Sequence, residues 1–201
     1  MGKPLSEMTL EELWELFPII LSEHKSCWTD WYEDERQALT ILLSGRRFKI
    51  HHIGSTAIPH IWAKPIVDIL IEIPENASME DIRDVLVRSG YICMSETENR
   101  ISLNKGYTSQ GFAERVFHIH LRRCGDHDEL YFRDYMNDHP ALAKEYEKLK
   151  LSLRKKYEHD RDAYTGAKSA FVKKYTDAAK AEYGNRYESA QMKRGTKEER
   201  G

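Results

Sequence analysis

The chain is poor in features that mark several common protein classes. Three cysteines in 201 residues are too few and too scattered for the disulfide framework of a small secreted domain. No apolar run approaches the roughly 20 residues needed to cross a bilayer, and the first residues lack the basic and apolar regions of a secretory signal. These absences predict a cytoplasmic protein with no membrane contact.

A strong charge of one sign is also missing. The 31 Lys and Arg residues nearly balance the 33 Asp and Glu residues, and the formal net charge is -2. A dedicated nucleic-acid-binding protein carries a marked basic excess, so nucleic acid is not an expected partner. The hydrophobic content of 40% is enough for one core. We expect one domain over residues 1–184 and a flexible charged tail over residues 185–201, whereas the oligomeric state stays open.

Hydrophobic periodicity divides the chain into alternating elements. Helical patterns cover residues 10–17, 28–43, 78–89, 140–157 and 162–184, and strand patterns cover residues 48–53, 65–73, 91–94, 100–103 and 114–122. The run 65–73 is apolar on both faces, which is typical of a central strand. This order predicts an α/β (α+β) domain in which helices flank a mixed sheet and the C-terminal part is helical.

The segment after the first predicted strand carries a group of small and hydroxylated residues. Gly54 lets a ligand approach the main chain closely, and Ser55 and Thr56 offer hydroxyl and N–H groups that can surround a phosphate. Lys64 adds a positive charge. Asp68 follows Ser55 by thirteen positions on the central strand, where a carboxylate is costly unless it has a role. Together these residues predict a phosphate-binding site.

This segment, HIGSTAIPHIWAKPIVDIL, resembles the signature of the GrpB family in the nucleotidyltransferase superfamily. Further matches lie at residues 132–135, at His139 and Pro140, and at residues 164–168. The resemblance implies a nucleotidyltransferase-like fold in which the Gly-Ser turn and Asp68 face one cleft. It also implies metal-dependent transfer of a nucleotide as the ancestral chemistry.

The resemblance to the superfamily implies that Asp68 binds a Mg²⁺ or Mn²⁺ ion whose further ligands are phosphate oxygens. Leu70 stands where the superfamily pattern has its second metal carboxylate. His118 and His120 lie on one face of a predicted strand, so either can complete a metal site with Asp68 or contact a substrate hydroxyl. We therefore expect Asp68 and His120 to be catalytic and Asp68, His118 and His120 to be metal ligands.

Cations are needed to neutralise a nucleoside triphosphate, and Arg133 and Lys168 are the candidates outside the turn. The hypothesis is a nucleotidyltransferase that moves a nucleotide from an NTP donor to a hydroxyl of an unidentified small molecule or protein. The alternative is an inactive sensor that kept the cleft for a nucleotide or phosphate ligand, which Leu70 favours. His118, His120, Cys124 and His127 also offer zinc ligands, but their spacing is not that of a familiar structural zinc site.

Overall fold

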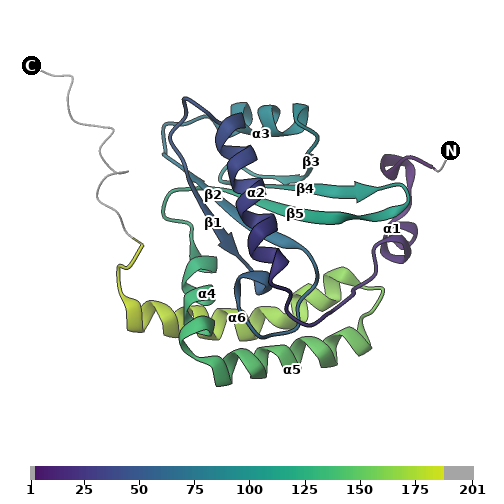
Figure 1. Cartoon of the computed structure of the whole chain (residues 1–201), viewed down its shortest axis with the longest axis vertical. Coiled ribbons are helices and arrows are strands. Elements are labelled where there is room, and N and C mark those ends of the chain that lie inside the picture. The colour runs from purple at the N-terminus through teal and green to yellow at the C-terminus, as the bar shows by residue number, and fades with distance from the viewer. Residues whose placement is uncertain (1–2, 188–201) are drawn as a thin grey trace, which may run out of the picture.

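The computed structural model describes residues 3–187 and contains one five-stranded sheet in the order β1-β2-β5-β4-β3 (Figure 1). The strands are β1 (Lys49–Ile53), β2 (Val67–Ile73), β3 (Ile92–Glu96), β4 (Arg100–Thr108) and β5 (Gly111–Arg123). β2 and β5 are parallel, and the other neighbours are antiparallel. The sheet is therefore mixed, as expected.

Helices cover both faces of this sheet. They are α1 (Leu10–Leu16), α2 (Cys27–Leu42), α3 (Met79–Arg88), α4 (Asp128–Asp138), α5 (Pro140–Lys156) and α6 (Arg161–Tyr183), with short 3-10 turns η1 (Leu5–Glu7) and η2 (Ser55–Ala57). α2 and α3 pack on one face, whereas α4, α5 and α6 pack together at the end of the molecule near β1 (Figure 1). The predicted fold class, with flanking helices and a helical C-terminus, is confirmed.

Local sequence signals explain where several elements begin. Thr9 caps α1 through a reciprocal pair of hydrogen bonds with Glu12, and Ser78 caps α3 by accepting from the amide of Asp81. Pro140 occupies the first turn of α5, where its missing N–H costs nothing. β4 and β5 run longer than predicted and form a hairpin with its turn at residues 108–111.

Alternation along β2 separates a core face from a functional face. Val67, Ile69 and Ile71 lie in the main core against α2 and α3. Asp68, Leu70 and Glu72 therefore point to the opposite face, where the C-terminal helices pack. β5 pairs with β2 in register and sends His118 and His120 to the same face as Asp68.

The expected start of the tail at residue 185 is corrected by Tyr187. Its ring packs edge-on against Tyr131 and joins the small cluster of Ile53, Leu70 and Leu130. Its hydroxyl donates to Asp134. The packed domain thus continues at least to Tyr187, and the rest of the predicted tail, residues 188–201, lies outside the described residues.

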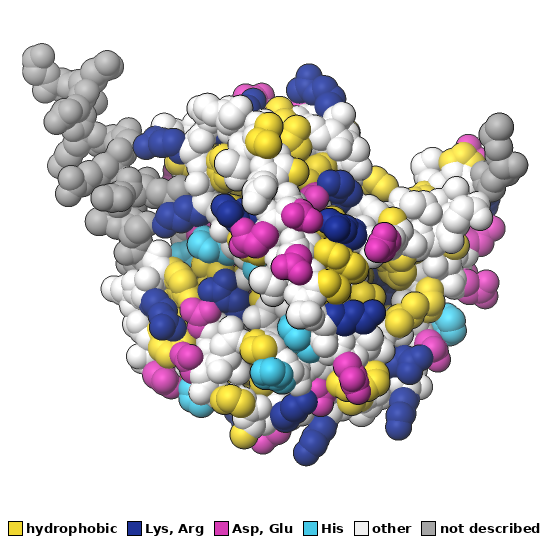
Figure 2. All heavy atoms as spheres, viewed as in Figure 1, with side chains coloured by type: hydrophobic (Ala, Val, Ile, Leu, Met, Phe, Trp, Pro, Cys, Tyr) yellow, Lys and Arg dark blue, Asp and Glu magenta, His cyan; other side chains and the backbone are white. Residues whose placement is uncertain are grey.

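The surface carries charges of both signs in alternation. On the face shown in Figure 2, lysine and arginine side chains are interspersed with carboxylates rather than gathered in one area. Within residues 3–187, no helix is both long and apolar enough to span a bilayer.

Candidate functional site

The functional face of the sheet forms the floor of a cleft with a volume of about 1040 Å³. Its opposite wall comes from α5 and α6, and α1 closes one end. Predicted site residues meet here from three separate segments. The cleft is lined by Gly54, Ser55, Lys64, Asp68, His118, His120 and Lys168, all of which the sequence predicts as site residues.

Gly54 is required by the close approach of its main chain to Asp68. Its φ of 71° lies in the left-handed region, and a Cβ atom built there would stand 2.3 Å from Asp68 Oδ2. No side chain fits in that space. The turn thus holds one oxygen of Asp68 against the main chain that precedes Ser55.

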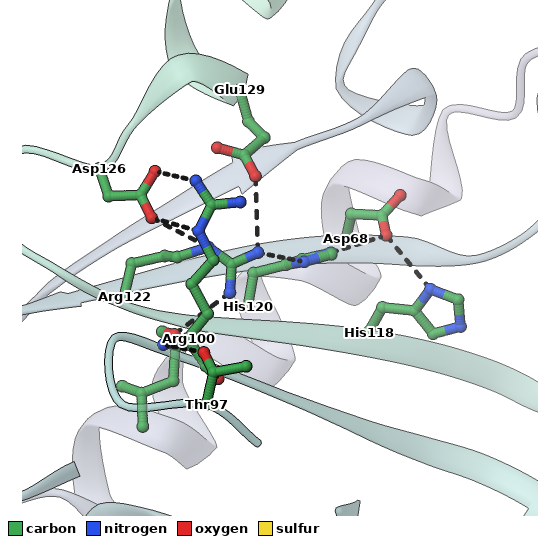
Figure 3. A network of polar contacts seen from close by, with 9 residues as sticks. Asp68, Thr97, Arg100, His118, His120, Arg122, Asp126 and Glu129 are labelled. Carbon is green, nitrogen blue, oxygen red and sulfur yellow. Dashed lines mark hydrogen bonds and ion pairs between the residues drawn. The ribbon is translucent and has the colours of Figure 1, made fainter. Parts of the chain in front are cut away.

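The other oxygen of Asp68, Oδ1, is contacted by both predicted histidines. His118 Nδ1 lies 3.3 Å and His120 Nε2 3.2 Å from Asp68 Oδ1, as Figure 3 shows. Burial alone would raise the pKa of Asp68, but the hydrogen bonds from His118 and His120 outweigh it and hold that pKa far below its usual range. Asp68 is therefore a stable carboxylate that two imidazoles orient.

A second layer of contacts fixes the proton of His118. Arg161 donates to the Tyr107 hydroxyl oxygen at 2.9 Å, and that hydroxyl lies 2.8 Å from His118 Nε2. Because arginine can only donate, the hydroxyl hydrogen is directed to Nε2, which leaves the ring hydrogen of His118 on Nδ1, facing Asp68. A β-bulge at Gly106, where φ is 90°, breaks the alternation of β4 and turns Tyr107 to this face.

Arg122 fixes the proton of His120 in the same way. Its guanidinium lies 3.4 Å from His120 Nδ1, so that nitrogen must accept and Nε2 carries the hydrogen that Asp68 receives. Arg122 is itself placed by Asp126 and Glu129, both 3.7 Å away, and Arg100 binds Asp126 from the surface (Figure 3). Each imidazole thus donates to Asp68 from an assigned nitrogen.

This arrangement does not form a resident metal site of the predicted kind. Within residues 3–187, no three His, Cys, Asp or Glu side chains are placed to hold a metal ion together. In each imidazole, the nitrogen that faces the cleft carboxylate is hydrogen-bonded to Asp68. Leu70, which stands at the position of the second metal carboxylate, is buried with Ile53 and Leu130. The zinc hypothesis also fails geometrically, because His127 binds Glu72 in a separate buried cluster.

Three lysines line the same cleft as Asp68. Lys150 is 2% exposed, donates to the Trp62 carbonyl and lies 4.8 Å above the Tyr146 ring. Lys64 and Lys168 stand 5.6 and 4.4 Å from the ring of Tyr164. None of the three forms an ion pair with a described residue. Their positive charge is therefore left for a ligand.

Burial and mutual repulsion lower the pKa of these lysines. Burial is the main cause for all three, and it lowers the pKa of Lys64 and Lys150 to about 7 and that of Lys168 to about 8. Lys168 further lowers the pKa of Lys64 and of Lys150. A bound anion would favour the charged lysines and so raise these pKa values again.

Two predicted phosphate-binding residues do not reach the cleft. Thr56 is 2% exposed and its hydroxyl contacts His52 Nε2 at 2.9 Å, so it secures the turn from inside. Arg133 donates to the His52 carbonyl and pairs with Asp134 at 2.7 Å. Neither residue lines the cleft, because partners on β1 and α4 occupy these groups.

The structure also brings in residues that the sequence analysis missed, namely Asn104, Tyr107, Arg122, Lys150 and Arg161. Of these residues, Lys150 stands out in the sequence pattern of its own helix. It stands four residues after Tyr146 on the apolar stripe of α5, where a lysine is out of place. Asn104 and Tyr107 depend on strand pairing and on the bulge at Gly106, and Arg161 depends on where α6 begins beside the cleft, none of which a local pattern reveals.

The fold and cleft define a small α/β protein with a basic ligand site, and comparison with known proteins gives its family. The family described as GrpB protein matches residues 18–178, so the chain belongs to the GrpB family. The crystal structure of conserved protein GrpB from Enterococcus faecalis is 32% identical, with a TM-score of 0.71, over 82% of this chain and 99% of that chain. The predicted family is confirmed.

Two other similar proteins are matched over less than half of their own length. UPF0157 protein YqkA of Bacillus subtilis (strain 168) is 33% identical over 165 residues, which are 81% of this chain but 47% of that protein. The chain thus spans about half the length of this curated relative. A structure of the Cid1 poly(U) polymerase with MgGTP bound is 12% identical, with a TM-score of 0.44, over 74% of this chain and 46% of that chain.

Proposed function

We propose that the cleft binds a nucleoside triphosphate and transfers its nucleotide to a hydroxyl of a small molecule or protein. The single observation that carries this proposal is the set of three unpaired lysines, Lys64, Lys150 and Lys168, opposite an oriented carboxylate. A triphosphate supplies several negative charges in a row, which suits several cations along one wall. The Gly54-Ser55 turn offers main-chain room for a phosphate beside them.

In this scheme Asp68 orients the acceptor through Oδ2, the oxygen that neither histidine contacts. The acceptor oxygen bonds to the α-phosphorus, the bond from that phosphorus to the pyrophosphate oxygen breaks, and the hydroxyl proton is released to water. The lowered pKa of Asp68 suits it to orient the hydroxyl rather than to keep its proton. Little covalent chemistry is required of the protein in such transfers, because positioning and charge neutralisation supply most of the acceleration. The lysines neutralise the departing pyrophosphate.

The predicted Mg²⁺ or Mn²⁺ belongs to this proposal only as a companion of the nucleotide. Mg²⁺ usually keeps several waters and is bound by one or two carboxylates together with substrate phosphates. Asp68 can supply one such carboxylate, whereas the histidines, as nitrogen donors already bound to Asp68, are poor ligands for it. The ion would add positive charge at the transferred phosphate.

The experiment is titration calorimetry of ATP, GTP, CTP and UTP, each with Mg²⁺ and with a chelator. We expect at least one nucleotide to bind and Lys150→Met to weaken it about tenfold or more, since a charge-assisted contact is worth about 1.5–3 kcal/mol. The control is Lys148→Met, an exposed lysine on the same helix. Equal nucleotide affinity in both variants, or no binding to the wild type, would contradict the proposal.

A second candidate, the inactive sensor, is favoured by the burial of Leu70 with Ile53 and Leu130. That packing leaves one carboxylate where nucleotide transfer commonly uses two. The same samples separate the two functions when pyrophosphate release is followed with a panel of hydroxyl acceptors. Release that depends on an acceptor identifies a transferase, whereas tight binding without release across the panel favours the sensor.

A further inference from the structure

A row of side chains crosses the sheet from Asp68 to its open edge. Strand pairing sets Asp68 opposite His118, His118 opposite Asn104, and Asn104 opposite Ile92. Residues paired across neighbouring strands point to the same face, so all four line the cleft. With strands about 4.8 Å apart, the row extends roughly 14 Å from Asp68.

Asn104, in the middle of this row, is a largely buried residue whose carboxamide opens onto the cleft. Its side chain faces the cleft and is 9% exposed, yet it makes no hydrogen bond with any residue in the described range. A carboxamide carries both a donor and an acceptor, and that of Asn104 is not among the buried side-chain atoms cut off from water. The carboxamide of Asn104 is therefore available to a ligand that offers a donor and an acceptor.

The far end of the row is apolar and unusually open. Ile92 and Met94 on the edge strand β3 are 40% and 55% exposed. α1 has no buried residue, and its Leu10, Leu13 and Trp14 line the same cleft. Clustered exposed apolar side chains mark binding surfaces, unlike single ones.

Contacts within the protein hold this apolar end in place relative to Asp68. Phe17, at the end of α1, packs its ring 4.7 Å from Tyr107 and 5.0 Å from Phe112. Tyr107 in turn contacts His118. The apolar wall and the carboxylate are thus connected through Phe17, Tyr107 and His118.

We propose that this row, Asp68, His118, Asn104 and Ile92, is the acceptor site, and that the acceptor is a small hydroxyl compound with an amide-like group and an apolar or aromatic end. This inference rests on the proposed function for the role of the hydroxyl. The order of groups follows the order of residues: the hydroxyl lies at Asp68, the amide-like group hydrogen-bonds Asn104, and the apolar end lies on Ile92, Met94 and α1. The triphosphate occupies the opposite wall, at the lysines.

The probe for this site is N-benzyl-2-hydroxyacetamide, which carries a hydroxyl, an amide and a phenyl ring in that order. Its binding is followed by ¹H–¹⁵N NMR titration of the full chain. We expect shifts at the amides of the row, and at least fivefold weaker binding to Asn104→Leu and to Met94→Ser. Ile41→Ser, at a 74% exposed residue on α2, is the control and should bind the probe like the wild type.

Titration of the same variants with the best-binding nucleotide separates this inference from the proposed function. Nucleotide affinity should stay within twofold of the wild type in Asn104→Leu and in Met94→Ser. A probe that binds all variants equally would overturn the acceptor site while leaving the nucleotide site intact. A loss of nucleotide affinity in Asn104→Leu would also overturn it, because Asn104 would then contact the nucleobase. Met94→Ser changes an exposed residue and remains informative if Asn104→Leu fails to fold.

Discussion

At the scale of residues, the site is organised around one carboxylate whose two oxygens have different tasks. Asp68 Oδ1 accepts from His118 and His120, whereas Oδ2 lies against Gly54. Groups that can only donate, Arg161 through Tyr107 and Arg122 directly, fix the hydrogen of each imidazole. The histidines therefore act on Asp68, and it is Asp68 that is left to face a substrate.

The tautomer of His120 provides a direct test of this description. In the wild type we expect the ¹⁵N shifts of His120 to show a protonated Nε2 and an unprotonated Nδ1, because Arg122 donates to Nδ1. Arg122→Gln should shift the Nδ1 resonance, since a neutral amide replaces the guanidinium, while Nε2 stays protonated because the Asp68 carboxylate can only accept. His118, held by Tyr107, should keep its own shifts. An unchanged His120 spectrum in the variant would contradict the assigned role of Arg122.

Gly54 gives a prediction from close packing. A Cβ atom at this position would stand 2.3 Å from Asp68 Oδ2, and φ is 71°. Gly54→Ala must therefore displace Asp68 or the turn, and we expect a loss of more than about 2 kcal/mol in the free energy of unfolding, together with weaker nucleotide binding. Gly90→Ala is the control for backbone strain, since its φ is also positive but no atom lies within 4 Å of the added carbon. Equal stability losses in the two variants, measured by urea unfolding, would argue against the contact with Asp68.

At the scale of elements, the sequence predicts what depends on local pattern and misses what depends on pairing. The apolar run of β2 and the spacing of Asp68 after Ser55 suffice to predict the strand and the carboxylate. Alternation likewise predicts that His118 and His120 share one face. Asn104 becomes a site residue only because β4 pairs with β5, a relation that no local pattern reveals, whereas Lys150 left only the signal of a lysine on the apolar stripe of α5.

The packing of α4 on β2 explains why position 70 is apolar. Leu70 is fully buried with Ile53 and Leu130. We expect Leu70→Asp to lower the free energy of unfolding by about 3–5 kcal/mol, because it removes apolar contacts and buries a carboxylate. Leu70→Met, which keeps the volume, should cost less than about 1.5 kcal/mol. A folded Leu70→Asp protein of wild-type stability would show that this side chain faces the cleft instead.

At the scale of the whole molecule, the cleft holds positive charges close together, and an anionic ligand can neutralise them. α5, α6 and the loop before β2 bring Lys150, Lys168 and Lys64 together without a carboxylate partner. The protein holds them below their ordinary pKa, so part of its stability is given up at neutral pH. Such an arrangement persists where it serves binding, and it ties the affinity of the cleft to pH.

The most direct test of this account is calorimetry of inorganic tripolyphosphate or the best-binding nucleotide at pH 7.5 in two buffers that differ in ionisation enthalpy. A bound polyphosphate favours the charged lysines and raises pKa values that stand at about 7 and 8 in the free protein. Binding should therefore take up between about one and two protons, fewer in Lys150→Met, and affinity should fall as pH rises above 8. Absence of binding, or binding without proton uptake, would contradict the central claim that these lysines hold the phosphates.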